Sequence, residues 1–125
     1  MKIIIVDDSD LVRKCVRETL DEHHDFMCAG EAGNIDEGLR LVLDVKPDIV
    51  LLDIVMPGGS GLRLLRTVKA LAPECKVIML STEADKQIRR EAAEMGADAF
   101  LDKAFEFENL ADTIRACSKN YSVNS

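Results

Sequence analysis

The chain has 125 residues, a length that fits one domain. Hydrophobic residues make up 47% of it, enough to bury a core rather than leave the chain disordered, whereas aromatic residues make up only 4%. The formal net charge of −7 argues against direct nucleic-acid binding by this domain, because sequence-independent binding needs clustered Lys and Arg.

The four cysteines, Cys15, Cys28, Cys75 and Cys117, lie far apart and form no CxxC or Cys/His pattern with metal-ligand spacing. We therefore predict small buried side chains in a reducing compartment. The chain begins directly with an apolar strand, and no segment approaches the ~18 consecutive apolar residues that a membrane span needs. These features predict a cytoplasmic protein without membrane contact.

Short apolar segments alternate along the chain with longer segments of helical period. Asn34 and Glu37 form a predicted capping box, Gly96 has the position that ends a helix, and Leu43 and Leu71 are expected on inward helix faces. In chain order, the elements are a strand at 2–6, a helix at 11–20, a strand at 26–30, a helix at 35–43, a strand at 48–53, a loop at 56–61, a helix at 62–71, a strand at 76–80, a helix at 88–95, a strand at 98–102 and a helix at 107–117.

Five β-α units in succession predict an α/β fold, a doubly wound five-stranded parallel sheet with helices on both faces. The segment 48–53 is apolar on both faces, as parallel strands are when helices cover both sides of the sheet. Residues 1–120 are assigned to this domain and 121–125 to a C-terminal tail. In open sheets of this kind, functional sites lie at the carboxyl ends of the strands.

Polar side chains stand at those strand ends. A single Asp in such a position is more often a helix cap or a turn former than a functional group. The coincidence of several groups at the ends of four separate strands favours a functional site instead. The groups are Asp7 and Asp8 after the first strand, Asp53 after the third, Ser81 and Thr82 after the fourth, and Asp102 and Lys103 after the fifth.

Three neighbouring carboxylates repel one another unless a cation neutralises them, and oxygen ligands favour Mg²⁺. Asp7 and Asp8 are adjacent, as suits a pair of metal ligands. Asp53 stands alone at the end of the most buried strand, before a Gly/Pro loop, and a carboxylate is a competent nucleophile toward phosphorus. Ser81 and Lys103 would then stabilise the oxygens of the transferring group. The pattern therefore predicts phosphoryl transfer to Asp53.

Four motifs in order carry a family resemblance: IIIVDD at 3–8, LLDIVMPGGSGL at 51–62, VIMLS at 77–81 and GADAFLDKAF at 96–105. Over essentially its whole length the chain resembles the receiver domains of two-component response regulators, the CheY-like family. The resemblance implies a flavodoxin-like sheet with strand order 2-1-3-4-5.

The resemblance also implies a two-component phosphorelay in which a sensor histidine kinase or a phosphotransfer protein phosphorylates Asp53. The last helix, the fifth strand and the helix at 84–95 would form the output surface toward a downstream protein target, and a phosphorylation-dependent dimer is left open. Such a domain is not a turnover enzyme, since it carries out only its own phosphorylation and slow self-dephosphorylation.

The family pattern assigns roles to individual residues here. Lys103 is followed by Ala104 where the family usually has a proline after a bond that is often cis; a cis bond before Ala would cost ~3 kcal/mol. The resemblance implies Mg²⁺ ligands at Asp7, Asp8, Asp53 and the backbone carbonyl of Val55, phosphoryl contacts at Ser81 and Lys103, an aromatic switch at Phe100, and modulating side chains at Thr82 and Glu83.

Three other interpretations compete with this one. A haloacid-dehalogenase-type phosphatase also uses an Asp nucleophile with Mg²⁺, but it needs a second Asp where this chain has Val55. A pseudo-receiver, which binds partners without phosphorylation, usually lacks an acidic position or the Lys, whereas Asp7, Asp8, Asp53 and Lys103 are all present. The chain could also be the regulatory half of a DNA-binding regulator.

Overall fold

A computed structural model describes residues 1–104 and 106–123, with the side chains of 119–123 excepted. Its five-stranded sheet is entirely parallel and has the order β2-β1-β3-β6-β7. With β6 and β7 as the strands of the fourth and fifth β-α units, this is the predicted order 2-1-3-4-5, which is confirmed. The strands are β1 (Lys2–Val6), β2 (Met27–Ala32), β3 (Ile49–Leu52), β6 (Lys76–Ser81) and β7 (Ala99–Asp102).

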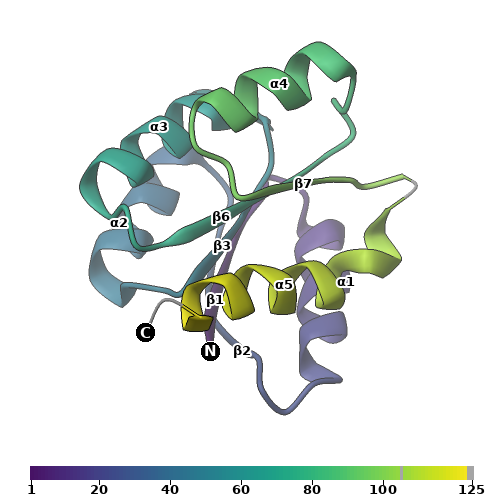
Figure 1. Cartoon of the computed structure of the whole chain (residues 1–125). Helices are drawn as coiled ribbons and strands as arrows, with labels where there is room; N and C mark the ends of the chain where they lie inside the picture. The colour runs from purple at the N-terminus through teal and green to yellow at the C-terminus, as the bar shows by residue number, and fades with distance from the viewer. Residues whose placement is uncertain (105, 124–125) are drawn as a thin grey trace.

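Helices cover both faces of this sheet, as predicted (Figure 1). Helices α1 (Asp10–Asp21) and α5 (Leu110–Val123) pack on one face. Helices α2 (Ile35–Val45), α3 (Gly61–Leu71) and α4 (Lys86–Glu94) pack on the other. A 3₁₀ turn, Phe107–Asn109, forms the start of the last predicted helix. Helix α5 includes residues 121–123 of the predicted tail, and residues 124–125 lie outside the described residues.

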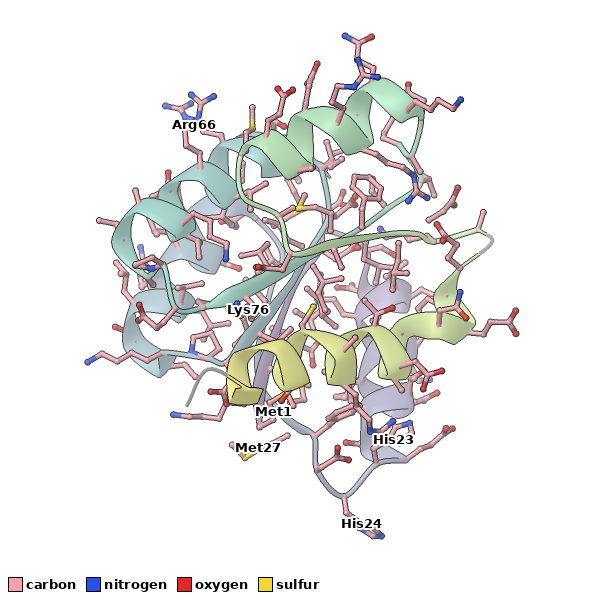
Figure 2. The ribbon with its side chains drawn as sticks, viewed as in Figure 1. Met1, His23, His24, Met27, Arg66 and Lys76 are labelled. Atoms are coloured by element: carbon pink, nitrogen blue, oxygen red, sulfur yellow. The ribbon has the colours of Figure 1, made fainter. Side chains whose placement is uncertain are left out.

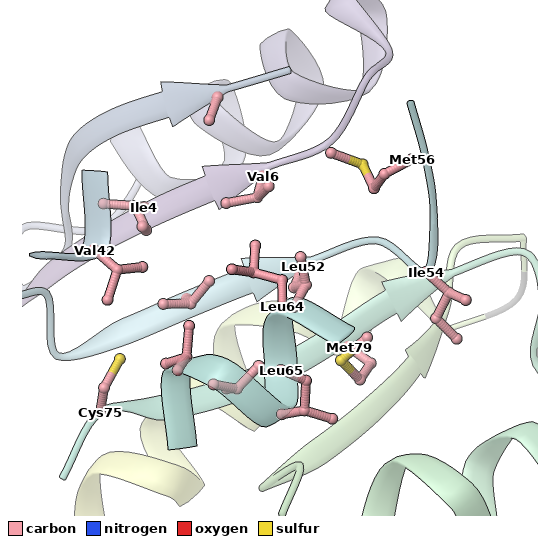
Figure 3. Close-up of a cluster of buried hydrophobic side chains, with 14 of the residues drawn as sticks. Ile4, Val6, Val42, Leu52, Ile54, Met56, Leu64, Leu65, Cys75 and Met79 are labelled. Carbon is pink, nitrogen blue, oxygen red and sulfur yellow. The ribbon is translucent and has the colours of Figure 1, made fainter. Parts of the chain in front are cut away.

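The core consists of two apolar layers, one on each side of the sheet. Figure 3 shows the layer beneath α2, α3 and α4. In β1, Ile4 and Val6 face α2, α3 and α4, whereas Ile3 and Ile5 face α1 and α5. β3 and β6 alternate in the same way, because successive side chains of a strand point to opposite faces. Each fully buried Ile or Leu contributes about 1.5–3 kcal/mol. The three central strands, β1, β3 and β6, are therefore well packed and hold the residues at their carboxyl ends in fixed positions.

Side-chain caps fix where the helices begin. The hydroxyl of Ser9 accepts from the backbone N–H of Val12 (3.2 Å) at the start of α1. The Asn34 side chain accepts from the backbone N–H of Glu37 (2.9 Å) at the start of α2. The reciprocal half of the predicted capping box is displaced, since the Glu37 carboxylate accepts from the N–H of Gly33 (3.3 Å).

The predicted loop at 56–61 instead contains a small antiparallel hairpin of β4 (Val55–Met56) and β5 (Gly59–Ser60). Gly58 and Gly59 allow this reversal because their φ angles are +87° and +143°. Gly61 follows at the start of α3, where a Cβ atom would lie 1.8 Å from the carbonyl oxygen of Asp53. The helix can therefore begin directly against the end of β3 only with glycine at this position.

The predicted inward positions of Leu43 and Leu71 are wrong, because these side chains are 48% and 60% exposed. Both lie in the last turns of their helices and line a cavity of 470 Å³ at the amino ends of the strands. Met1 and Lys76, labelled in Figure 2, line the same cavity. An apolar stripe on a helix predicts burial only where the sheet continues beneath it.

The prediction that all four cysteines are buried is only partly correct. Cys75 and Cys117 are buried, Cys28 is half-buried and Cys15 is exposed on α1; all four are free thiols. Within the described residues, no helix is long and apolar enough to cross a membrane.

Candidate functional site

Backbone hydrogen bonds align the ends of the strands that carry the predicted site residues. The N–H of Asp53 donates to the carbonyl of Val6 (3.0 Å), which joins the ends of β3 and β1. The N–H of Lys103 donates to the carbonyl of Ser81 (3.1 Å), which joins the ends of β7 and β6. The strand ladders thus continue to the residues of interest, and the positions of their Cα atoms are set by the sheet.

The sheet brings the three predicted carboxylates together. One oxygen from each of Asp7, Asp8 and Asp53 lies within 4.8 Å of the others. Asp7 and Asp53 are buried, at 3% and 7% exposed, whereas Asp8 is exposed. The cluster is therefore embedded in the protein on one side and open to solvent on the other.

Lys103 reaches this cluster from the end of β7. Its Nζ lies 2.5 Å from Asp7 Oδ2 and 3.0 Å from Asp53 Oδ2. Burial by itself would lower the pKa of Lys103, but the hydrogen bonds to Asp7 and Asp53 and the negative charges of these two residues together outweigh that effect and raise the pKa above its usual value. Lys103 is therefore a firmly protonated ammonium group shared by the two buried carboxylates.

The other oxygen of each buried carboxylate is held by backbone. Asp7 Oδ1 accepts from the N–H of Ser9 (2.9 Å), and Asp53 Oδ1 accepts from the N–H of Ile54 (2.7 Å). Each carboxylate thus has one oxygen fixed by its own turn and one facing Lys103. This fixes the rotamers of both side chains before any ligand binds.

The residues present fit a divalent cation. Three carboxylates and one ammonium carry a formal charge of 3 × (−1) + 1 = −2, which a divalent ion would balance. All the side-chain donors are oxygen atoms, as Mg²⁺ prefers, and the open side at Asp8 leaves room for the waters that Mg²⁺ retains.

Ser81 stands at the end of the neighbouring strand and is fully buried. Its Oγ accepts from the backbone N–H of Glu83 (3.1 Å), so the hydroxyl belongs to a turn rather than to the carboxylate cluster in this structure. The side chains of Thr82 and Glu83 are exposed beside it. Val55 begins β4 with its side chain 59% exposed, and the predicted role of its carbonyl stays a prediction.

Phe100 is half-buried on the face of the sheet that α4 covers. The guanidinium of Arg89, from α4, lies over its ring and donates from Nη1 to the carbonyl of Phe100 (3.3 Å). Arg89 also forms an ion pair with Glu106, whose carboxylate accepts from the N–H of Asp102 (3.1 Å). The predicted switch residue is thus part of a network that joins α4, β7 and the segment after Lys103.

Two arginines of this region were not among the predicted site residues: Arg89 of α4 and Arg13 of α1. Arg13 Nη1 donates to the carbonyl of Asp7 (2.5 Å), immediately behind the carboxylate cluster. The one available signal was its position on the helix that begins directly after Asp7 and Asp8.

The peptide bond between Lys103 and Ala104 is trans, as are all peptide bonds of the described residues. Replacement of the family's proline by Ala104 therefore still leaves Lys103 in contact with Asp7 and Asp53.

The family model of the response regulator receiver domain matches residues 3–115. The chain belongs to the response regulator receiver family. The match includes every strand, except for Lys2 at the start of β1, and every residue of the carboxylate cluster. The predicted resemblance is confirmed, and the chain is a CheY-like receiver of two-component signalling.

The chain matches nearly the full length of some relatives and only part of others. Protein CcdB of Bacillus subtilis is 34% identical over 113 residues, which are 90% of this chain and 93% of that protein. The transcriptional regulatory protein LiaR of Bacillus subtilis is 31% identical over 95% of this chain. The receiver spans only 56% of LiaR.

Solved structures of receivers share this fold closely. The receiver domain of the putative response regulator NarL from Mycobacterium tuberculosis has a TM-score of 0.88 and 27% identity, over 94% of this chain and 95% of that one. A CheY-like receiver domain protein from Methanospirillum hungatei JF-1 has a TM-score of 0.88 and 25% identity, over 99% of this chain and 98% of that one.

Proposed function

We propose that this receiver accepts a phosphoryl group on Asp53 from a sensor histidine kinase or a phosphotransfer protein, with Mg²⁺ bound at Asp7, Asp8 and Asp53. The observation that carries the proposal is the position of Lys103, whose Nζ lies 3.0 Å from Asp53 Oδ2 and 2.5 Å from Asp7 Oδ2. A buried nucleophile is thus paired with a fixed cation that can bind a phosphoryl oxygen.

In the proposed step, a lone pair on an Asp53 carboxylate oxygen forms a bond to phosphorus. The bond from phosphorus to the donor atom breaks, and the donor leaves with that electron pair. The product is an acyl phosphate on Asp53. A bound Mg²⁺ supplies further neutralisation of charge on the phosphoryl oxygens.

The chain's own residues would position the group and respond to it. The N–H of Ile54 holds Asp53 Oδ1, which orients the carboxylate. The protonated Lys103 would bind one phosphoryl oxygen and the hydroxyl of Ser81 another, once Ser81 Oγ gives up its bond from the N–H of Glu83. The segment after Ser81 and the ring of Phe100 would then change position together.

The output would be a change of the surface formed by α4, β7 and α5, read by a downstream protein target in the cytoplasm. Apart from its own phosphorylation and slow dephosphorylation, we propose no turnover reaction. A second candidate, the regulatory half of a transcription regulator, is favoured by the match to LiaR, of which this chain spans 56%. The sequence of the complete gene would decide it.

The test is the intact mass of the protein after incubation with acetyl phosphate, with and without Mg²⁺. We expect a Mg²⁺-dependent gain of one phosphate that hydroxylamine removes, as it removes an acyl phosphate. Asp53→Asn should fold normally and gain none. Asp102→Asn is the matched control, because Asp102 ends β7, which β6 separates from β3, and its carboxylate accepts from the N–H of Ala104 (2.8 Å).

Uptake of phosphate by Asp53→Asn at the wild-type rate would refute the assignment of the nucleophile. Absence of uptake by the wild type, together with absence of beryllofluoride binding, would favour the pseudo-receiver interpretation.

A further inference from the structure

The exposed carboxylate of the cluster belongs to Asp8, which supplies one of the three clustered oxygens. Among the side chains that the structure describes, in residues 1–104 and 106–118, none donates to this carboxylate. Asp7 and Asp53, in contrast, are held by backbone N–H groups and by Lys103. The direction in which the Cα–Cβ bond of Asp8 points is set by the two peptide groups on either side of its Cα atom.

Both of these peptide groups are fixed. The N–H of Ser9, from the peptide after Asp8, donates to Asp7 Oδ1 (2.9 Å). The carbonyl of Asp7, from the peptide before Asp8, accepts from Arg13 Nη1 (2.5 Å). Arg13 thus fixes the peptide group before Asp8, which is one of the two peptide groups that orient this residue.

Arg13 is itself firmly anchored. Its side chain is only 17% exposed. Nη2 pairs with Asp10 in the first turn of α1, and Nε lies 3.4 Å from a carboxylate oxygen of Glu31 at the end of β2. A guanidinium carries its donors on three separate nitrogen atoms of a planar fork, whereas Lys carries all its donors on a single nitrogen.

We propose that Arg13 is a positioning residue for the metal site, which aims Asp8 by holding the carbonyl of Asp7. The inference rests on the proposed Mg²⁺ site and adds a residue to it that touches neither the metal nor the phosphoryl group. Partners of this outer kind typically change metal affinity 10–100-fold when they are lost.

The charge of Arg13 and its geometry predict opposite effects on the Mg²⁺ affinity when Arg13 is removed. Loss of a cation near three carboxylates would strengthen Mg²⁺ binding, whereas loss of the fork would weaken it. Arg13→Lys separates the two, since it keeps the charge and removes the fork. Arg17→Lys is the matched control, because Arg17 lies one turn later on α1 and pairs with Glu31, and it has no described contact with Asp7.

The experiment is a titration of each protein with MgCl₂, in the absence of a phosphodonor and at a temperature well below that of unfolding. Binding is monitored by the backbone NMR chemical shifts of Asp8 and Ser9. We expect Arg13→Lys to raise the Mg²⁺ Kd about tenfold and Arg17→Lys to change it less than twofold. The rate of phosphate uptake by Arg13→Lys should return to the wild-type rate at saturating Mg²⁺. A general structural defect would instead lower that rate at every Mg²⁺ concentration.

Equal Kd values for the wild type and Arg13→Lys would overturn the inference while leaving the proposed function intact. Absence of Mg²⁺ binding by the wild type would instead refute the metal site of the proposed function. If Arg13→Lys does not fold, Glu31→Asp takes its place. Glu31→Asp shortens by one methylene the side chain that pairs with Arg13 and keeps its charge. An unchanged Mg²⁺ Kd for this variant would also overturn the inference.

Discussion

The guanidinium carbon of Arg89 lies 4.9 Å from the centre of the Phe100 ring, so a cation from α4 covers the aromatic residue of β7. Arg89 Nε also donates to the carbonyl of Ala84 (3.0 Å), in the segment that follows Ser81. Its ion pair with Glu106 reaches the segment that follows Lys103. One side chain therefore joins the two segments that connect the carboxylate cluster to the proposed output surface.

Arg89→Met should keep the apolar contact with Phe100 and remove the polar ones. Because the Arg89 side chain is 37% exposed, we expect the free energy of unfolding to fall by only about 1 kcal/mol. The amide of Asp102, which donates to Glu106, should exchange with solvent faster. Urea unfolding and hydrogen exchange measure these effects. Arg90→Met, at the next and exposed position, is the control, and identical behaviour of the two variants would contradict the prediction.

Lys103→Met should strengthen Mg²⁺ binding and slow phosphorylation. Without the ammonium, no cation competes for Asp7 and Asp53, so we expect Kd to fall about tenfold, or about 1.4 kcal/mol. Uptake of phosphate at saturating Mg²⁺ should fall about 100-fold, because a fixed charge at the phosphoryl oxygens is lost. Titration with MgCl₂ and the mass assay measure the two effects. Weaker Mg²⁺ binding by the variant would show that Lys103 does not compete with the metal.

Gly61→Ala should be the most damaging of the conservative changes near Asp53. Its Cβ would lie 1.8 Å from the carbonyl oxygen of Asp53, so α3 or the end of β3 must move. We expect a loss of more than about 3 kcal/mol in urea unfolding and a shift of the Asp53 amide resonance. Gly58→Ala is the control, since its Cβ would meet no atom within 4 Å and only the φ of +87° opposes it. That variant should lose about 1 kcal/mol, and equal losses would contradict the steric explanation.

Burial raises the pKa of the Cys75 thiol to about 11. The unfolded chain ionises this thiol at lower pH, so its contribution to stability is complete below about pH 9 and is lost as the pH rises toward 11. Between pH 8 and pH 10 the wild type should therefore lose about 1 kcal/mol more stability than Cys75→Ala, measured by urea unfolding. The exposed Cys15→Ala is the control. Parallel pH profiles of the wild type and Cys75→Ala would contradict the prediction.

The fold and the carboxylate cluster were predictable because each depends on local pattern. Runs such as IIIV and IVLL are apolar on both faces, which identifies buried parallel strands and thereby the edge where Asp7 and Asp53 meet. Leu43 and Leu71 were misplaced because helical periodicity does not show where the sheet beneath a helix ends. The hairpin at Val55–Ser60 was missed because two-residue strands leave no periodic signal.

The supporting arginines could not have been found in this way. Arg13 acts on Asp7 through a carbonyl, and Arg89 acts on Phe100 through a ring face and a carbonyl. Backbone oxygens are present at every position, so the sequence does not indicate which of them a long side chain will reach. Such contacts follow from the relative placement of helix and strand, which tertiary packing determines.

The cavity between the amino ends of the strands is lined by both Met1 and Ser118, from opposite ends of the chain. Asp53 lies at the opposite, carboxyl end of one of these strands, directly after β3. A fluorophore attached at Met1, or a protein module fused after α5, would therefore project from the edge remote from the carboxylates. This geometry suits the receiver to use as an interchangeable part in engineered sensors, since cargo could be attached at either end without obstructing access to Asp53.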